Sequence, residues 1–321
     1  MLIQPQKEIF IPIPLKVGMK GLWRIQCIRP DGRVRVDTGW FPNKILNNGR
    51  NNMVAQSNWL TWCHLGTGST TPVADDSQLE GFVVSSSTAL TNLGGTEGNA
   101  PYYGWRRKTW RFEVGAGQGG QNLSEVGAGW NSAGSTLVSR GLIIDSGTGL
   151  PTTVTPLVDE LVNVTYELRY YPPLNDVANS VGLFGTNYDT ITRAALVTNS
   201  VWSDYIGTSI GLLKIGNVSF VAYNGVLGAI TEGPTGTNYN IDEANNAYNL
   251  SYSNNSYERV MIVPCGPLGW NAASGIRSVR IYTTAGAYQT QFSSNPGGTT
   301  IPKTSSYTMV LGWTLGWTEY I

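Results

Sequence analysis

The sequence predicts an all-β protein made of antiparallel, sandwich-like domains with long Gly/Ser/Asn-rich loops and one short helix. From residue 101 onward, short runs of alternating apolar and polar residues recur with no helical segments between them. This pattern is typical of sandwiches and barrels rather than of parallel α/β sheets. The 39 glycines among 321 residues suit the many turns of such a fold. Aromatic residues make up 11% of the chain, whereas disordered segments contain few, so we expect a folded protein.

The charge balance excludes some classes of partner. The chain contains 21 basic and 21 acidic residues, and charged residues make up only 13% of it. Nucleic acids and anionic membranes both attract an excess of cationic side chains, so neither is expected as a partner of the whole chain. No apolar run approaches the roughly 18 residues of a membrane-spanning helix, so we expect no insertion into a membrane.

The three cysteines, Cys27, Cys63 and Cys265, are odd in number and far apart. They match neither a disulfide framework nor a zinc site, since a zinc site needs closely spaced ligand pairs. Thiols that stay reduced during cytosolic folding fit this spacing. The chain begins without the basic and apolar segments of a secretory signal. We therefore expect folding in the cytoplasm, with no metal and no other cofactor.

Residues 1–20 are predicted to form an extended N-terminal arm. Pro5, Pro12 and Pro14 exclude a helix there. From Ile9 to Leu15 every second side chain is an aliphatic one, which is the period of a β-strand. A period of two interrupted by prolines is typical of an edge strand or of an arm that docks on a neighbour. The alternative is that this segment is simply a strand of the first domain.

A β-hairpin is expected next, with strands at residues 22–28 and 33–37. The turn between them is Pro30-Asp31-Gly32, in which proline presets φ, aspartate bonds its own backbone and glycine accepts positive φ. The first fifty residues hold nine basic and only three acidic residues. Such charges fit the solvent-facing side of a strand, where alternate residues share one face. The alternative is a docking surface for an acidic neighbouring subunit.

The one helix is predicted at residues 50–63, where an asparagine can cap its start and apolar residues recur at near-helical spacing. Residues 64–100 are rich in glycine, serine and threonine and are expected to form long loops broken by short strands.

Strands are expected from residue 101 to the end of the chain. The first two lie at residues 109–115 and 136–145, and the clearest lies at 160–171. In this last strand the apolar side chains Val162, Val164, Tyr166, Leu168 and Tyr170 share one face, and Asn163, Thr165, Glu167 and Arg169 share the other. Later strands are expected at 217–223, 258–263, 277–283 and 305–320.

Two prolines at 172 and 173 end the clearest strand, and the composition then becomes richer in asparagine and glycine. We therefore expect one β domain at residues 21–174 and a second at 175–321. The alternative is one large β domain in which the two prolines form an ordinary turn.

The groups that could perform catalysis are few. His64 is the only histidine, and its neighbour Cys63 would point the other way in a strand, so a structural role is expected. The glycine-rich segments at 64–70 and 115–120 lack the lysine of a phosphate-binding loop. Paired carboxylates, which glycoside hydrolysis needs, occur at Asp75-Asp76, Asp159-Glu160 and Asp242-Glu243. We expect no enzymatic activity, no catalytic residue and no metal site.

Aromatic residues concentrate after residue 100 and provide the candidate site. Tyr102, Tyr103, Trp105 and Trp110 are interleaved with Arg106, Arg107, Lys108 and Arg111. Aromatic platforms beside polar groups can stack on sugar rings or anchor a protein interface. Arginine beside aromatic residues also suits single-stranded nucleic acid. The alternative is that many of these rings fill a sandwich core while the basic residues face solvent.

An ordered series of motifs runs through the first half of the chain. It comprises Trp40-Phe-Pro-Asn43, Cys63-His-Leu-Gly-Thr-Gly-Ser-Thr-Thr-Pro72, and the segments Asn122–Trp130, Leu137–Asp145, Pro151–Asp159 and Asn163–Pro173. Over roughly residues 22–175, about half the chain, this series resembles tailed-bacteriophage tail and tail-fibre proteins. The chain differs from them in lacking a long fibrous shaft and in its asparagine-rich second half.

The resemblance implies a virion structural protein of the tail, baseplate or tail fibre that contributes to host attachment. It implies a homo-oligomer that contacts other virion tail proteins and a host-surface glycan, and it supplies no catalytic residues. Two other functions stay open. The aromatic and carboxylate content also suits a module that binds or depolymerises carbohydrate, and the other alternative is a head decoration protein.

Overall fold

The computed structural model of the chain confirms the predicted fold class: 49% of it lies in strands and 3% is helical. The structure describes residues 12–55, 58–183, 185–211, 220–240, 248–266, 271–294, 298, 300–306 and 308–320. In this part of the chain the strands form three sheets of nine, five and six strands. The two helical elements there are α1 (Asn47–Asn52) and the single turn η1 (Ser200–Trp202).

The largest sheet takes strands from both ends of the chain. Its order is β16 (Tyr248–Asn249), β17 (Glu258–Cys265), β20 (Met309–Glu319), β1 (Pro12–Ile28), β11 (Leu161–Tyr171), β8 (Gly104–Phe112) and β7 (Ala89–Thr96). The short strands β2 (Val34–Asp37) and β3 (Phe41–Pro42) also pair with β1.

Each of the two smaller sheets uses strands from one half of the chain. The five-stranded sheet has the order β4 (Lys44–Ile45), β10 (Leu137–Leu142), β9 (Glu125–Gly129), β5 (Trp62–Gly66) and β6 (Phe82–Ser86). The six-stranded sheet has the order β12 (Val177–Leu183), β13 (Thr186–Ala195), β19 (Gly286–Ser294), β18 (Ser278–Thr283), β14 (Phe220–Tyr223) and β15 (Asn238–Asn240).

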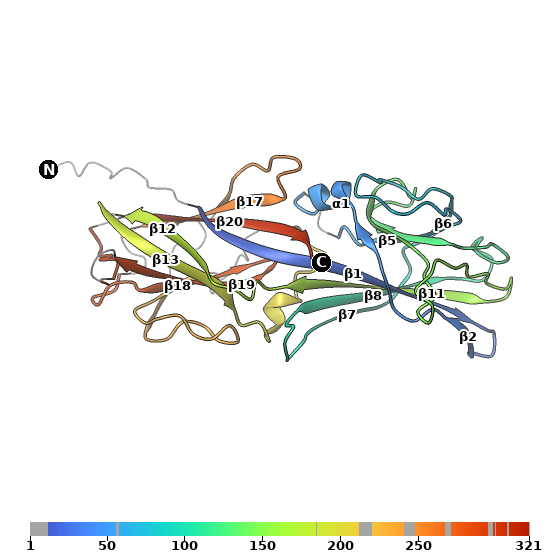
Figure 1. Cartoon of the computed structure of the whole chain (residues 1–321), viewed down its shortest axis with the longest axis horizontal. Helices are drawn as coiled ribbons and strands as arrows, with labels where there is room; N and C mark the ends of the chain where they lie inside the picture. The colour runs from blue at the N-terminus through green and yellow to red at the C-terminus, as the bar shows by residue number, and fades with distance from the viewer. Residues whose placement is uncertain are drawn as a thin grey trace.

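Strand β1 runs through both halves of the molecule (Figure 1). Its residues 12–19 pair with β20 in parallel, and its residues 18–28 pair with β11 antiparallel. The parallel pair differs from the all-antiparallel arrangement that the sequence predicts. It is sterically allowed because β1 and β20 lie at opposite ends of the chain, so no short hairpin has to join them.

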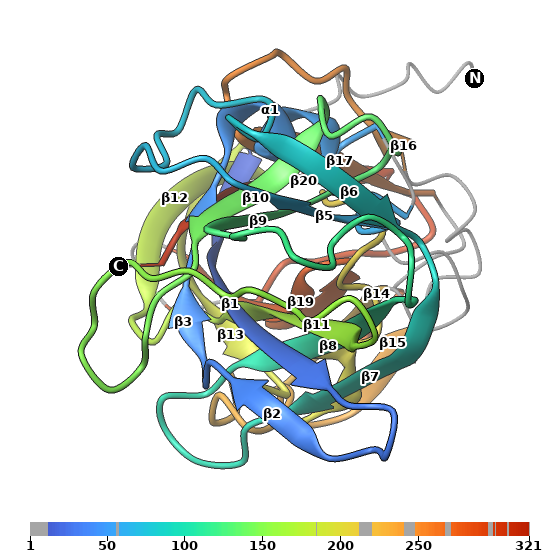
Figure 2. The same ribbon diagram turned by 90° about the vertical axis from the view of Figure 1, so that its right-hand side faces the viewer.

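Both smaller sheets pack on the large one, and together the three make two sandwiches. On the six-stranded side, the Tyr288 hydroxyl of β19 donates to the carbonyl of Lys16 in β1 at 3.1 Å. On the five-stranded side, Trp110 Nε1 of β8 donates to the carbonyl of Thr61 at 2.9 Å. Figure 2 shows the five-stranded sheet stacked face to face with β1, β11 and β8. A single core cluster of buried residues runs through both sandwiches.

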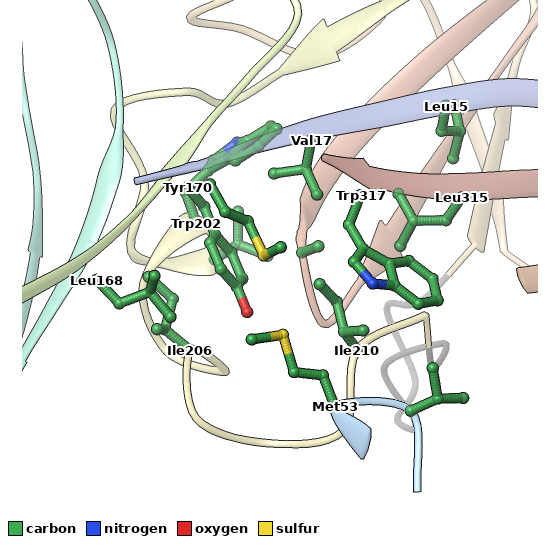
Figure 3. Packing of buried hydrophobic residues seen from close by; sticks show 14 of the residues in the cluster. Leu15, Val17, Met53, Leu168, Tyr170, Trp202, Ile206, Ile210, Leu315 and Trp317 are labelled. Carbon is green, nitrogen blue, oxygen red and sulfur yellow. The ribbon is translucent and has the colours of Figure 1, made fainter. Parts of the chain in front are cut away.

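The core is rich in aromatic side chains. The largest side chains with 2% exposure or less include the tryptophans Trp23, Trp59, Trp110, Trp202, Trp313 and Trp317. Figure 3 shows Val17 of β1 and Tyr170 of β11 packed with Trp202 of η1, and Met53 beside Ile210. The segment after η1 is tied to the end of α1, because the amide of Ile210 donates to the carbonyl of Met53 at 2.7 Å. Burial of this apolar surface is the main force that holds the sheets together.

The alternation predicted for the clearest strand is confirmed. It forms β11 (Leu161–Tyr171), and the five side chains expected on its apolar face are at most 1% exposed: Val162, Val164, Tyr166, Leu168 and Tyr170. The other face carries Thr165, Glu167 and Arg169, which bond to one another or to neighbouring strands.

The helix prediction at 50–63 is wrong in its position. The helix is α1 (Asn47–Asn52), and β5 already begins at Trp62. Met53, Trp59 and Leu60, whose spacing suggested a helix, are buried by tertiary packing in turns. The spacing of apolar residues over so short a segment therefore indicated which residues are buried, but not that they form a helix.

The expected domain limits do not coincide with breaks in the large sheet. β1 continues unbroken from residue 12 to 28, across the limit expected between arm and domain at 20, and residues 1–11 lie outside the described part. β17 and β20 follow residue 174 in the chain, yet they extend the sheet that contains β1, β11, β8 and β7.

Four basic residues of the first fifty positions, Arg24, Arg33, Arg35 and Lys44, form ion pairs within the chain. Arg24 bonds to Asp37 at 2.9 Å, Arg35 to the buried Glu160 at 2.6 Å, and Lys44 to Glu319 at 2.5 Å. These pairs leave less free charge for an acidic neighbouring subunit than the sequence alone suggests.

The predicted hairpin is confirmed, with β1 paired to β2 and Gly32 in the turn at φ +82°. A Cβ at Gly32 would meet nothing within 4 Å, so only backbone strain opposes it. We expect Gly32→Ala to lower the free energy of unfolding by about 1 kcal/mol. The measurement is the urea midpoint, with Gly98→Ala as control, since Gly98 is equally uncrowded and has no positive φ. Equal midpoints for the two variants would contradict the strain.

Candidate functional site

The outer face of the nine-stranded sheet carries the candidate site. Successive side chains of a strand point to opposite faces, so Trp105 and Arg107 of β8 lie on the face away from the core, whereas Trp110 lies on the core face. In register with these two residues, β11 presents Arg169 opposite Trp105 and Glu167 opposite Arg107. Cross-strand neighbours of this kind are close enough to interact directly.

At one end of the site, Arg107 lies between two indole rings. Its guanidinium carbon is 4.7 Å from the ring centroid of Trp105 and 5.2 Å from that of Trp40. Its Nε donates to Glu167 at 2.8 Å. Trp105 covers Gly95 of the neighbouring strand β7, where a Cβ would lie 2.7 Å from the ring. Glycine is therefore required beneath the indole, and the ring lies against the sheet.

Glu167 connects this end to the other. The carboxylate is 1% exposed and also accepts a bond from Arg169 Nε at 2.6 Å. The Arg169 guanidinium lies 4.4 Å from the ring centroid of Tyr103. Tyr103 is 5.2 Å from Tyr171, which stacks on Tyr320 at 3.8 Å. We call this set the aromatic ladder, and its members are Trp40, Trp105, Arg107, Glu167, Arg169, Tyr103, Tyr171 and Tyr320.

The ladder carries a net positive charge, because two arginines share one buried carboxylate. Its side chains are fixed by one another, through charge-assisted hydrogen bonds and cation–π contacts. Partial burial is the largest influence on the Tyr103 hydroxyl and raises its pKa, although the nearby Arg169 acts in the opposite direction. The phenol is therefore neutral and can donate a hydrogen bond at neutral pH. Leu93 of β7, paired with Arg107, adds an apolar side chain that is 54% exposed.

The four sequence-predicted aromatic residues separate in the structure. Tyr103 and Trp105 belong to the ladder. Trp110 is fully buried beside Trp23 and cannot meet a ligand in this structure, and Tyr102 packs against the core. Sequence reasoning missed Trp40, Arg169, Tyr171 and Tyr320. The polar face of the strand at 160–171 carried a signal for Glu167 and Arg169, but nothing local in the sequence pointed to Tyr320.

Several other residues that the sequence suggested as candidates are buried or ion-paired within the fold, where the structure describes them. His64 is fully buried in β5, and desolvation by burial lowers its pKa to about 4. The Cys63 thiol is buried as well, and desolvation raises its pKa. Of the paired carboxylates, Asp76 bonds to Arg140 and Glu160 bonds to Arg35, while Asp242 and Glu243 lie outside the described residues.

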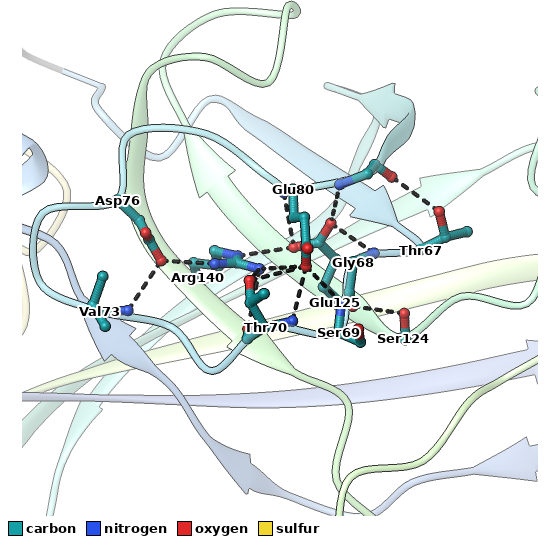
Figure 4. Close-up of polar contacts among 11 residues, drawn as sticks. Thr67, Gly68, Ser69, Thr70, Val73, Asp76, Glu80, Ser124, Glu125 and Arg140 are labelled. Carbon is teal, nitrogen blue, oxygen red and sulfur yellow. Dashed lines mark hydrogen bonds and ion pairs between the residues drawn. The ribbon is translucent and has the colours of Figure 1, made fainter.

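A second polar cluster surrounds Arg140 on the five-stranded sheet (Figure 4). Arg140 is 3% exposed and Glu125 is fully buried, and Arg140 Nε donates to this carboxylate at 2.8 Å. Arg140 also bonds to Asp76 at 2.7 Å. Glu125 accepts backbone N–H bonds from Gly68 at 2.9 Å and Gly81 at 2.7 Å. The cluster thus fixes both ends of the loop between β5 and β6. The buried guanidinium of Arg140 and the carboxylate of Glu125 both have hydrogen-bond partners within it.

Within the described residues, no three His, Cys, Asp or Glu side chains gather as metal ligands. The same part of the chain contains no helix with the length and apolar character needed to cross a membrane.

The comparisons with known proteins add no relative. No protein-family model, no curated protein and no solved structure matches this chain. The fold and the site therefore define it as an all-β protein of two sandwiches on one shared sheet, with a fixed aromatic and arginine surface on the open face of that sheet.

Proposed function

We propose that the protein is a non-enzymatic structural component of a tailed-phage virion, held in the tail, baseplate or tail fibre, and that the aromatic ladder is its docking face. The observation that carries the proposal is the ladder itself, a preformed surface of tryptophan, tyrosine and arginine. These three residue types dominate the energetic centres of protein interfaces. The motif series along residues 22–175 supplies the virion context.

The ladder is suited to docking because it is already ordered. Side chains that must be immobilised on binding each cost about 0.5–1.5 kcal/mol, and here Arg107 and Arg169 are held by Glu167 before any partner arrives. The partner that this surface fits is another virion tail protein or a second copy of the chain. A protein with this role needs a rigid fold and a contact surface but no catalytic groups. The ion pairs of Asp76 with Arg140 and of Glu160 with Arg35 are consistent with a structural role for these carboxylates.

Immunogold electron microscopy of purified virions tests the location. Antibody against the chain is expected to label the tail. Label confined to the head would favour a head decoration protein, and unlabelled virions would contradict both. Light scattering of the purified chain then shows whether a homo-oligomer forms and how many copies its symmetry contains.

Trp105→Ala is expected to reduce incorporation of the chain into virions by about tenfold or more, since truncating an interface tryptophan commonly costs over 2 kcal/mol. Immunoblots of purified particles measure this. The control is Phe82→Ala, an exposed aromatic residue (45% exposed) on β6, away from the ladder. Circular dichroism checks that both variants fold. Equal incorporation of both variants would count against the ladder as the docking face.

Glycan binding is the second candidate. Trp105 lies over Gly95, and Tyr320 is 38% exposed next to Tyr171, so aromatic rings lie at the surface of the sheet, where a sugar ring could contact them. A glycan array with the wild-type chain and Trp105→Ala separates the two roles. Binding that disappears in the variant would favour a host-surface glycan as the partner, and a blank array together with no cleavage of polysaccharide would remove this role.

A further inference from the structure

A small pocket lies on the core-side face of β8, beside the junction of the two sandwiches. Arg106 and Lys108 of β8 point to this side, opposite to Trp105 and Arg107. The pocket has a volume of about 110 Å³, which exceeds the space that one water molecule needs. It is lined by Asn58, Leu60, Asn92, Arg106, Lys108, Asp204, Ile206, Gly207 and Thr208. In Figure 1 the yellow helical turn next to β7 and β8 is η1, just before Asp204.

The two cations of the pocket have no carboxylate partner among the described residues. Lys108 Nζ donates to the carbonyl of Leu60 at 2.7 Å and lies 5.0 Å from the ring centroid of Trp110. Arg106 Nε donates to Asn92 Oδ1 at 2.5 Å. All ten ion pairs of the described chain involve other basic residues. Two half-buried positive charges therefore face the same small space without an ion-pair partner.

Asp204 lines the pocket as well: its carbonyl accepts a hydrogen bond from Arg106 Nη1 at 3.5 Å, and its carboxylate accepts one from Ser200 Oγ at 2.9 Å. The pocket keeps a net charge of one positive unit. Burial is the largest influence on Lys108 and lowers its pKa, because a partly desolvated ammonium lacks the solvation it has in water. An anion in the pocket would restore that stabilisation, and it would do so in surroundings less polar than water, where charge pairs are stronger.

The walls of the pocket are fixed before any ligand binds. The amide of Asn58 donates to the carbonyl of Gly207 at 3.0 Å, and Trp59 Nε1 donates to the carbonyl of Thr208 at 2.7 Å. These bonds join the loop before β5 to the segment after η1. Arg106 is oriented by its bonds to Asn92 Oδ1 and to the carbonyl of Asp204, so its remaining N–H groups need little reorganisation.

We propose that this pocket binds one small oxyanion, either a carboxylate or a phosphate group, between Arg106 and Lys108. An oxyanion accepts charge-assisted hydrogen bonds from both cations, and the planar guanidinium of Arg106 matches two of its oxygens. The volume admits one such group and excludes a whole oligosaccharide, so a carboxylated sugar would enter with its acid group only. The site lies on the other face of β8 from the ladder and does not depend on the proposed docking function.

Isothermal titration calorimetry at pH 7 and constant ionic strength, kept with potassium chloride, tests the site. The probes are inorganic phosphate and glucuronate. The wild-type chain is expected to bind at least one of them saturably with one-to-one stoichiometry. Saturation by phosphate alone would identify a phosphate site, and saturation by glucuronate alone would identify a site for carboxylated sugars. No saturable heat with either probe would overturn the proposal.

The variants Arg106→Gln and Lys108→Gln are each expected to weaken binding by about tenfold or more, because a charge-assisted hydrogen bond is lost. Arg111→Gln is the matched control. It removes an arginine from the same strand on the opposite face, where Arg111 Nε donates to Asn163 at 3.2 Å, and it is expected to bind like the wild type. Thermal unfolding checks each variant. Unchanged affinity in both folded pocket variants, or an equal loss in Arg111→Gln, would refute the site.

Discussion

Replacing Arg140 with methionine is expected to lower the free energy of unfolding by about 3–5 kcal/mol, because it leaves a buried charge without its partner. Glu125 is fully buried and its carboxylate is compensated by Arg140 Nε at 2.8 Å. Asp76, the other close partner of Arg140, has a side chain 21% exposed and can be solvated by water once the guanidinium is gone. The uncompensated charge of Glu125 therefore dominates the effect.

A double variant distinguishes this explanation from a simple loss of packing. Adding Glu125→Gln to Arg140→Met removes the buried charge while keeping an amide oxygen that can accept the N–H bonds of Gly68 and Gly81. The double variant is expected to be more stable than Arg140→Met alone. Guanidinium unfolding measures the midpoints of the wild type, both single variants and the double variant. A double variant less stable than Arg140→Met would mean that lost packing, not the orphaned charge, destabilises the protein.

The sequence predicts β11 best, because the pattern of this strand can be interpreted without knowing which strands lie beside it. In β11 the alternation of apolar and polar residues reflects a single boundary between core and outer face, so the period of two suffices. The same rule, applied to β8, separates Trp105 from Trp110, since five positions apart means opposite faces. The composition of this segment suggested one aromatic site, whereas its periodicity already assigned one tryptophan to the core and one to the outer face.

The rest of the ladder could not be predicted from local patterns. Tyr171 and Tyr320 stack only because β1 pairs with β11 on one side and with β20 on the other. Pairings between strands this far apart in the chain depend on the whole fold. No turn motif joins such strands directly, so local sequence patterns do not predict the pairing. The position of the helix failed for a related reason, because Met53 and Trp59 are buried by contacts with residues after η1 rather than by an amphipathic helix.

Acidification from pH 7 to pH 5 is expected to lower the free energy of unfolding by roughly 2 kcal/mol through His64 alone. Burial lowers the pKa of His64 in the folded protein from 6.5 to about 4, and neither ring nitrogen has a hydrogen-bond partner in the described structure. Between these two values the unfolded chain binds a proton that the folded chain does not. The stabilisation is therefore complete above pH 6.5 and decreases as the pH falls toward 4.

The pH window isolates this residue, because His64 is the only histidine of the chain. The carboxylates with lowered pKa, Asp31, Asp37, Glu80, Asp145 and Glu160, lose their contribution as the pH falls from about 5 downward, below the range in which His64 acts. Urea midpoints of the wild type and His64→Leu, measured at several pH values from 7 to 5, test the assignment. His64→Leu is expected to give a nearly flat profile, whatever its stability at pH 7. A variant that keeps the wild-type slope would show that another group takes up the proton, and that burial of a neutral imidazole does not control the acid response.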